Sequence, residues 1–237
     1  MKRNMDVVAP AFFQNEATRD ARCWIFLASS RNFDIPVYLY GTPSAQYPGL
    51  TAMRISVLAE VLKTLSGCRH VLITDVWDAF FIAPLETIWE RYEAAGSPPM
   101  LMAASRILGN VQDVDASPYR TSFDRTQTYP YPDNGGYIGE RDTIIEVLSN
   151  LDRSRSHDDT YAWIDAWKDN RFRPTLDHGH QIFQNGVTEC EIRDGRLVNT
   201  VTNSFPCIAH FGGGYCDPVA GKDDRMRPWA RSLGIIA

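Results

Sequence analysis

The sequence predicts an α/β fold with a mostly parallel central sheet to which a small β-hairpin is added. In the first half of the chain, short apolar strands alternate with helices, which is the order expected of parallel sheets. The segment 70–74 has an apolar centre and runs directly into Asp75. Ligands bind at the carboxyl ends of strands in such sheets, so Asp75 occupies a position typical of a binding site. In the second half, Asp194-Gly195 separates two strand-like segments and suits a type I′ hairpin turn.

The individual elements follow from apolar periodicity and from turn residues. Strands are expected at 5–9, 36–40, 70–74, 100–103, 189–192, 196–200 and 207–210, with a return to the core at 135–139. Helices are expected at 17–32, 57–65, after Pro84, at 142–151 and at 158–167. Residues 42–50 are expected to form a Pro/Gly loop. The long polar segment 105–133 is expected to be irregular and is a candidate for a lid.

Composition restricts the classes of protein. A chain of 237 residues that is 44% hydrophobic can bury one sizeable core, so a single domain over 1–237 is expected. With a net charge of −5, the protein lacks the overall positive charge that is typical of nucleic-acid-binding proteins. No apolar run approaches the roughly 20 residues that span a bilayer, and the N-terminus is a poor signal peptide. With an odd number of Cys residues, this favours a reducing compartment, the cytoplasm of a bacterium or of a phage- or virus-infected cell.

The first candidate functional segment is Asp75-Val76-Trp77-Asp78. Two carboxylates lie three residues apart inside an apolar run, and buried carboxylates need a cation or hydrogen bonds. Mg²⁺ or Mn²⁺ bridging a diphosphate would supply that charge, and Trp77 offers a flat face to a base or a sugar. A structural interpretation has similar weight: Asp78 caps a turn and Trp77 belongs to the core.

His210 ends an apolar strand and is followed by Gly212-Gly213-Gly214. Histidine is a common ligand for Mn²⁺-type ions, and glycines let backbone N–H groups approach phosphate closely. A single histidine is more often structural. Combined with Asp75 and Asp78, however, His210 would supply a third ligand from a distant segment.

Three further segments have structural and functional interpretations. Asp133-Asn134-Gly135-Gly136 is either a plain turn or a polar ledge that contacts sugar hydroxyls. The acidic pair Asp158-Asp159 suits a helix start for dipole reasons alone, or it serves catalysis. The third segment contains Asp177, His178 and His180. Its two histidines could bind metal, but a structural strand and turn is the favoured interpretation.

Taken in order, these five segments resemble the glycosyltransferase domain of the procollagen lysyl hydroxylase–glycosyltransferase family, from residue 5 to about residue 215. The most specific parts are Leu176-Asp177-His178 with 182–185, the Asp-Gly hairpin and His210. The resemblance implies a GT-A fold, a Rossmann-like domain that binds a nucleotide-sugar. On this basis, residues 1–104 form the nucleotide-sugar-binding half, and residues 105–237 form the half that binds the acceptor and completes the metal site.

The resemblance also implies roles for individual residues. Asp75, Asp78 and His210 match the family's Mn²⁺ ligands, and Asp158 and Asp159 match an acidic cluster that lines the sugar and acceptor pocket. Donor contacts are implied for Trp77, which falls where the family stacks an aromatic ring on uracil, and for Val76, Arg54, Asp133, Asn134, Gly135, Gly136, Gly212 and Gly213. Two motifs depart from the family pattern. Asp133 replaces an Asn, or Asn134 is its equivalent, and the phosphate loop after His210 differs.

The implied reaction is Mn²⁺- or Mg²⁺-dependent transfer of a hexose from a UDP-sugar to a hydroxyl group. The acceptor is either a hydroxylated polypeptide side chain or a hydroxymethylated pyrimidine in DNA, because some related stand-alone domains of phages and microbes are thought to modify DNA bases. Two other classes of function stay open. One is a metal-dependent hydrolase of nucleotide-sugars or phosphoesters that uses Asp75, Asp78, His178 and His210. The other is a non-catalytic sugar-binding module.

Overall fold

The computed structural model describes residues 5–10, 16–40, 50–65, 67, 69–107, 123–151, 159–168, 172–212 and 222–237. The strands are β1 (Met5–Pro10), β2 (Val37–Tyr40), β3 (His70–Thr74), β4 (Ala79–Phe81), β5 (Met100–Ser105), β6 (Tyr131–Glu140), β7 (Thr175–Leu176), β8 (Phe183–Asn185), β9 (Cys190–Arg193), β10 (Arg196–Asn199) and β11 (Ile208–His210). The helices are α1 (Glu16–Asn32), α2 (Leu50–Thr64), α3 (Leu85–Ala94), α5 (Arg141–Asn150), α6 (Asp159–Lys168) and α7 (Lys222–Ser232).

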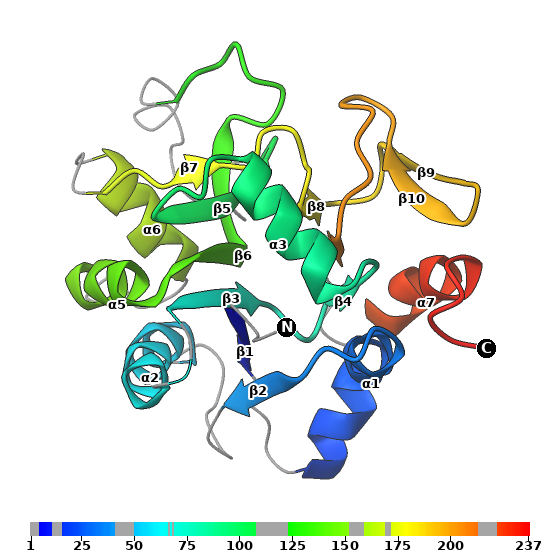
Figure 1. Cartoon of the computed structure of the whole chain (residues 1–237), viewed down its shortest axis with the longest axis horizontal. Coiled ribbons are helices and arrows are strands. Elements are labelled where there is room, and N and C mark those ends of the chain that lie inside the picture. The colour runs from blue at the N-terminus through cyan, green and yellow to red at the C-terminus, as the bar shows by residue number, and fades with distance from the viewer. Residues whose placement is uncertain are drawn as a thin grey trace.

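A six-stranded sheet with the strand order β2-β1-β3-β6-β5-β7 forms the centre of the molecule (Figure 1). Strand β1 pairs in parallel with β2 and β3, and β5 pairs in parallel with β7. Strand β6 runs antiparallel between β3 and β5. The predicted α/β class with a mostly parallel sheet is confirmed, and β6 is the one strand that reverses direction within this sheet.

Helices cover both faces of the sheet, because successive side chains of a strand point to opposite sides. One face packs against α2, α5 and α6, which together supply residues such as Leu58, Ile144 and Trp163. The other face packs against α1 and α3, through Phe26 and Ile88 among others. Figure 1 shows α2, α5 and α6 gathered on one side of the sheet. The expected amphipathic helix at 57–65 is confirmed within α2.

A second, three-stranded sheet with the order β4-β11-β8 lies beside the main one. Strand β11 pairs antiparallel with β4 and in parallel with β8. The inner face of this small sheet, which includes Phe81 and Phe183, joins the core around α1 and α3. Its outer face, which includes Phe80 and Ala209, packs with residues of α7 and of the β9–β10 hairpin.

The predicted hairpin is confirmed. Strands β9 and β10 pair antiparallel and are joined by Asp194 and Gly195, which have φ angles of 53° and 71°. Positive φ at both central residues is what a type I′ turn requires, and Asp-Gly tolerates it better than most residue pairs.

Several elements differ from the sequence-based expectations. Residues 131–133 belong to β6 and not to an irregular segment, and Asp133–Gly136 lies inside that strand and not in a turn. Strand β4 and helix α7 were not expected. The segment around Asp177, for which a strand and a turn were favoured, contains two short strands, β7 and β8. The three strands have at most three residues each, which is too short for periodicity to reveal. Most of the expected loop at 42–50 and residues 108–122 of the candidate lid lie outside the described residues.

Candidate metal and donor site

Asp75 and Asp78 are placed by the two strands that flank them. Asp75 directly follows β3, and its backbone N–H donates to the Gly135 carbonyl oxygen at 3.0 Å. Asp78 directly precedes β4, and its carbonyl oxygen accepts a hydrogen bond from the Phe211 N–H at 2.6 Å. Backbone contacts to β6 and to the end of β11 therefore fix both positions in the connection between β3 and β4.

His210 comes to the same place from the other end of the chain. It is the last residue of β11 and pairs with Ala79, the first residue of β4. Because β11 and β4 are antiparallel neighbours, the last residue of one lies opposite the first residue of the other. The imidazole of His210 therefore lies directly beside Asp78.

The three side chains form one compact cluster. The His210 Nε2 atom lies 3.5 Å from a carboxylate oxygen of Asp75 and 3.5 Å from one of Asp78. One ligand atom from each residue lies within 4.8 Å of the others. The side chains of His210 and Asp78 are only 8% and 9% exposed. Two carboxylates and an imidazole in this arrangement can hold a divalent metal ion.

Two glycines make the room that the His210 ring occupies. A Cβ atom added at Gly135 would lie 2.1 Å from Cε1 of His210, and one added at Gly212 would lie 2.2 Å from the same atom. Real Cβ atoms do not approach other atoms so closely. The ring therefore passes between two backbone segments that only glycine leaves open, which is a structural reason for both glycines beside the expected donor contacts.

A bulge in β6 brings Gly135 to the ring. On the side of β5, Met102 pairs with Tyr137, while the next residue, Ala103, pairs with Asp133. The intervening residues of β6, 134–136, therefore have no partner on β5. On the side of β3, Gly136 pairs with Thr74. Bulges are common beside active sites because they redirect local backbone and side chains. Here the bulge holds the glycine segment against the Asp75–Asp78–His210 cluster.

Asp133 lies on the opposite side of the imidazole from the two other carboxylates. Its Oδ1 atom lies 3.5 Å from His210 Nδ1 and accepts a hydrogen bond from the Gly135 N–H at 2.8 Å. The Nδ1 atom is buried and makes no hydrogen bond. Metal-bound histidines usually present their second ring nitrogen to a carboxylate, which fixes the ring orientation. The position of Asp133 fits that arrangement.

The surroundings of His210 favour its charged form. Burial by itself lowers the pKa of His210, but the negative charge of Asp78, hydrogen bonds to Asp75 and Asp78, and the charge of Asp133 outweigh it and raise the pKa well above its usual value. Three carboxylates around one imidazole thus attract positive charge to this point.

The other expected donor residues have different surroundings. Val76 is buried and packs in the core around α1 and α3. Trp77 is half-buried and packs against that same core. Gly136 faces Phe183, whose ring would lie 2.6 Å from an added Cβ atom. Asn134 is half-buried within the bulge.

The acidic pair Asp158-Asp159 lies at the edge of a described segment, which begins at residue 159. Asp159 is the first residue of α6, so the predicted helix is confirmed, but Asp158 and Gly213 lie outside the described residues. Arg54 belongs to α2. The side chains of Asp159 and Arg54 lie outside the described part of the structure.

The segment around Asp177 has the structural role that its sequence favoured. The buried Asp177 carboxylate accepts hydrogen bonds from the backbone N–H groups of Gln181, Ile182 and Phe183 at 2.9, 2.8 and 2.9 Å. These bonds close the turn that leads into β8. Asp177 therefore acts on the site only through the strand that lies beside β11.

The two neighbouring histidines also have structural surroundings. His180 is fully buried, lies 3.1 Å from the Ala104 carbonyl oxygen through Nε2, and stacks on Tyr129 with ring centroids 3.7 Å apart. Nδ1 of His178 lies 2.7 Å from the Tyr129 carbonyl oxygen. His178 is not part of the Asp75–Asp78–His210 cluster. The structure therefore does not bring together the four ligands that the hydrolase interpretation requires.

One residue near the cluster was not among the candidate site residues. Asn185 pairs in register with His210, on parallel strands β8 and β11. Paired residues of neighbouring strands point to the same face of a sheet, so Asn185 lies on the same face as His210. The segment 182–185 contributed to the family resemblance, but its residues did not indicate a separate role for Asn185.

The fold and the cluster together define a class of protein: this is the GT-A architecture of a glycosyltransferase. The family model described as the PLOD GT domain matches residues 17–216, and the chain belongs to this family of glycosyltransferase domains. The expected family is confirmed.

Two individual proteins add to the comparison. A glycosyltransferase involved in the glycosylation of the major capsid of PBCV-1 superposes with a TM-score of 0.58 at 8% identity, over 95% of this chain and 100% of that one. At such low identity the likeness shows the fold alone. An uncharacterised protein of Acanthamoeba polyphaga mimivirus is 23% identical over 164 residues, or 68% of this chain. The chain spans 35% of the length of that relative.

Among the described residues, no helix combines the length and the apolar character needed to cross a membrane.

Proposed function

We propose that this protein transfers a hexose from a UDP-sugar to an acceptor hydroxyl group with the help of Mn²⁺. The observation that carries the proposal is the Asp75–Asp78–His210 cluster at the carboxyl end of β3. Nucleotide ligands bind at this edge of open α/β sheets. The family match supports transfer as the reaction, and the cluster supports a metal-bound diphosphate donor.

The residues of the cluster fit a divalent ion. Two ligand atoms on one ion, each about 2.1 Å from it, lie at most about 4.2 Å apart. The distances of 3.5 Å from His210 Nε2 to Asp75 and to Asp78 fall inside that limit, and the ligand atoms of Asp75 and Asp78 lie within 4.8 Å of each other. A bound Mn²⁺ or Mg²⁺ would neutralise charge that develops on the leaving diphosphate. Asp133 would hold the His210 ring in the orientation that points Nε2 toward the ion.

The remaining residues position the two substrates. Trp77 stacks on the uracil, and the backbone of Gly135 and Gly136 lies against the sugar. Asp158 and Asp159 are assigned the acidic role at the anomeric carbon. In that role they act as a general base if the configuration inverts, or they stabilise positive charge on the sugar if it is retained. In this proposal, residues 1–104 bind most of the nucleotide, and residues 105–237 complete the metal site through His210 and bind the acceptor.

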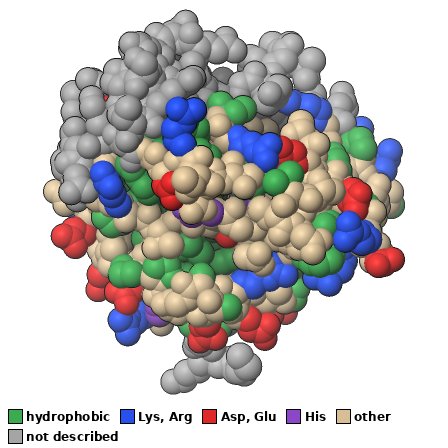
Figure 2. All heavy atoms as spheres, turned by 90° about the horizontal axis from the view of Figure 1, so that it is seen from above, with side chains coloured by type: hydrophobic (Ala, Val, Ile, Leu, Met, Phe, Trp, Pro, Cys, Tyr) green, Lys and Arg blue, Asp and Glu red, His purple; other side chains and the backbone are tan. Residues whose placement is uncertain are grey.

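The acceptor is a hydroxylated polypeptide side chain or a hydroxymethylated DNA pyrimidine. On the face seen in Figure 2, basic and acidic side chains are interspersed over the described residues and do not gather into one basic patch. The net charge of −5 of the whole sequence favours a polypeptide acceptor over DNA. A gel shift with hydroxymethylated and plain DNA at two salt concentrations separates the two, because phosphate-driven binding weakens steeply with salt.

A thermal-shift panel tests the donor class. UDP should raise the melting temperature of the protein above its value with Mn²⁺ alone, whereas GDP or ATP should add nothing to the effect of Mn²⁺, because only a ligand that binds the native state stabilises it. Asp75→Asn and Asp78→Asn should both lose the Mn²⁺-dependent response. Asp142→Asn, which changes an exposed carboxylate on α5, should keep it. A normal response in both cluster variants would overturn the assignment of the site.

Hydrolysis is the competing reaction. A hydrolase releases sugar or phosphate from a UDP-sugar at the same rate with and without an acceptor. A transferase consumes the donor faster when a suitable hydroxyl is present. The position of His178, which faces Tyr129 outside the cluster, weighs against the four-ligand hydrolase site.

A further inference from the structure

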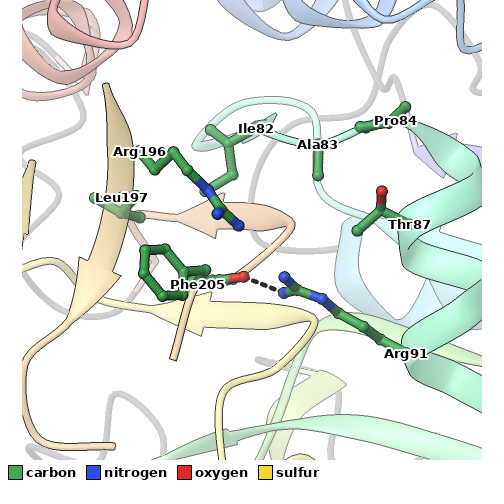
Figure 3. Close-up of a pocket in the computed structure, with 9 residues that line it drawn as sticks. Ile82, Ala83, Pro84, Thr87, Arg91, Arg196, Leu197 and Phe205 are labelled. Carbon is green, nitrogen blue, oxygen red and sulfur yellow. Dashed lines mark hydrogen bonds between the residues drawn. The ribbon is translucent and has the colours of Figure 1, made fainter. Parts of the chain in front are cut away.

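We propose that a second pocket, at the start of α3 and separate from the Asp75–Asp78–His210 cluster, binds a small oxyanion such as phosphate. The pocket has a volume of about 170 Å³ and lies between α3, the β9–β10 hairpin and the segment before β11. Arg91 of α3 and Arg196 of β10 contribute guanidinium groups to it, and Phe205 lies between them (Figure 3).

Each guanidinium makes a different contact. The Arg196 guanidinium carbon lies 4.1 Å from the centre of the Phe205 ring, a cation–π contact, and the residue is otherwise exposed to solvent. The Nη1 atom of Arg91 donates hydrogen bonds to the carbonyl oxygens of Gln181 and Phe205. These bonds use one of the three nitrogens of Arg91. The other guanidinium nitrogens can donate to the oxygens of an oxyanion.

The described lining of the pocket carries two positive charges and no carboxylate. In the described part of the chain, neither Arg91 nor Arg196 forms an ion pair with a carboxylate. Burial raises the pKa of the nearby Cys207 thiol to about 12; the positive charges of Arg91 and Arg196 oppose the rise, and the negative charge of Asp177 adds to it. Both guanidinium groups therefore act on the same region, which the Asp177 carboxylate also reaches.

The start of α3 borders the pocket. Pro84, in the N-cap position, and Thr87, in the first turn of this ten-residue helix, line it, and no side chain caps the helix there. Pro84 has no N–H group, and the Thr87 N–H donates to the Pro84 carbonyl oxygen at 3.1 Å. The helix dipole favours an anion at this end, although the first turn also carries the acidic Glu86. The two arginines therefore supply most of the positive charge of the pocket.

The pocket and the metal cluster lie at opposite ends of the same strand pair. At the pocket end, the Ile82 N–H donates to the Cys207 carbonyl oxygen at 2.8 Å. At the cluster end, His210 pairs with Ala79. Three residues of extended chain, about 10 Å, separate the two ends. An anion in the pocket is therefore not the diphosphate of the donor.

Calorimetry with inorganic phosphate tests the proposal in buffer that contains neither metal nor nucleotide, at an ionic strength held constant with chloride. Arg196→Gln should weaken phosphate binding by about tenfold or more, because a charge-assisted contact is lost. Arg193→Gln is the matched control: it removes an arginine of the same hairpin that pairs with Glu191 outside the pocket. It should bind phosphate as the unaltered protein does.

Two further arms complete the test. Asp75→Asn should keep phosphate binding, because the pocket shares no residue with the cluster. Acetate in place of phosphate decides whether the pocket accepts carboxylates as well, and loss of either anion in Arg196→Gln supports the proposal. Equal phosphate affinity in Arg196→Gln and in the unaltered protein would overturn it, as would loss of binding in Asp75→Asn. Because metal and nucleotide are absent, failure to bind UDP does not affect the result.

Discussion

The imidazole ring of His210 occupies the space in which a side chain at position 135 would lie. A Cβ atom there would be 2.1 Å from Cε1 of the ring, and a Cβ atom at Gly212 would be 2.2 Å from the same atom. The two glycines therefore set the position of His210, and through it the geometry of the cluster with Asp75 and Asp78.

Gly135→Ala should displace the His210 ring and weaken Mn²⁺ binding. The added methyl group collides with the ring, and overpacking of this kind costs about 1–3 kcal/mol of stability unless the ring moves away. We expect the ring to move, with metal affinity reduced by about tenfold to a hundredfold. Titration of Mn²⁺ followed by calorimetry measures the effect.

The control for that variant is Gly67→Ala. The nearest atom to an added Cβ at Gly67 lies 3.8 Å away, in the Asp6 side chain, which is an ordinary contact distance. Gly67→Ala should bind Mn²⁺ normally. If Gly135→Ala also binds Mn²⁺ with unchanged affinity, His210 is not a ligand.

Asp133→Asn separates the charge of Asp133 from its hydrogen bond. Oδ1 of the asparagine can still accept the bond from the Gly135 N–H, which is 2.8 Å long, but the negative charge facing His210 Nδ1 is lost. Metal affinity should fall by about tenfold to a hundredfold while the melting temperature of the metal-free protein changes little. Asp133→Ala should lower both quantities. Equal metal affinity in Asp133→Asn and the unaltered protein would exclude an orienting role.

Asp177→Ala should destabilise the protein. The buried carboxylate accepts three backbone hydrogen bonds, and its removal leaves those N–H groups without their partner. We expect a loss of about 3 kcal/mol in the free energy of unfolding, measured in urea. Asp177→Asn, which keeps one acceptor oxygen, should lose less. Full stability of Asp177→Ala would show that water replaces the carboxylate.

Stability should fall as the pH decreases below about 6.5, partly because of His180. Burial lowers the pKa of His180 in the folded protein, outweighing the opposing effects of Asp177 and of hydrogen bonds to Gln184 and Ala104. Between the lowered pKa and the ordinary one, the unfolded chain binds a proton that the folded protein does not, so acid favours unfolding. Above that window both states are neutral at this residue, and its contribution is constant.

His180→Asn tests this contribution. The variant should be less stable at pH 7.5, because the contact with Tyr129 and the hydrogen bonds of the ring are lost. Its stability should nevertheless fall less steeply between pH 7 and pH 5.5. If stability depends on pH as steeply in His180→Asn as in the unaltered protein, His180 does not cause the acid sensitivity. His70, whose pKa is also lowered by burial, would then be the candidate.

The sequence alone determined the fold class, most longer elements and the hairpin. These features depend on interactions between residues close in the chain: apolar periodicity over ten or more residues, or the two positive φ angles that Asp194 and Gly195 tolerate. The paired carboxylates Asp75 and Asp78 and the later His210 could be selected for the same reason, as polar residues at the ends of apolar strands.

Only the tertiary structure decided how these residues meet. The antiparallel pairing of β11 with β4 brings His210 to Asp78, and the bulge in β6 brings Gly135 and Asp133 to its ring. Neither pairing leaves a periodic signal, because strands of three residues have no measurable period and a bulge interrupts the alternation of its own strand. The members of the cluster could therefore be predicted from the sequence. Their geometry depends on strand register, which is set by segments far apart in the chain.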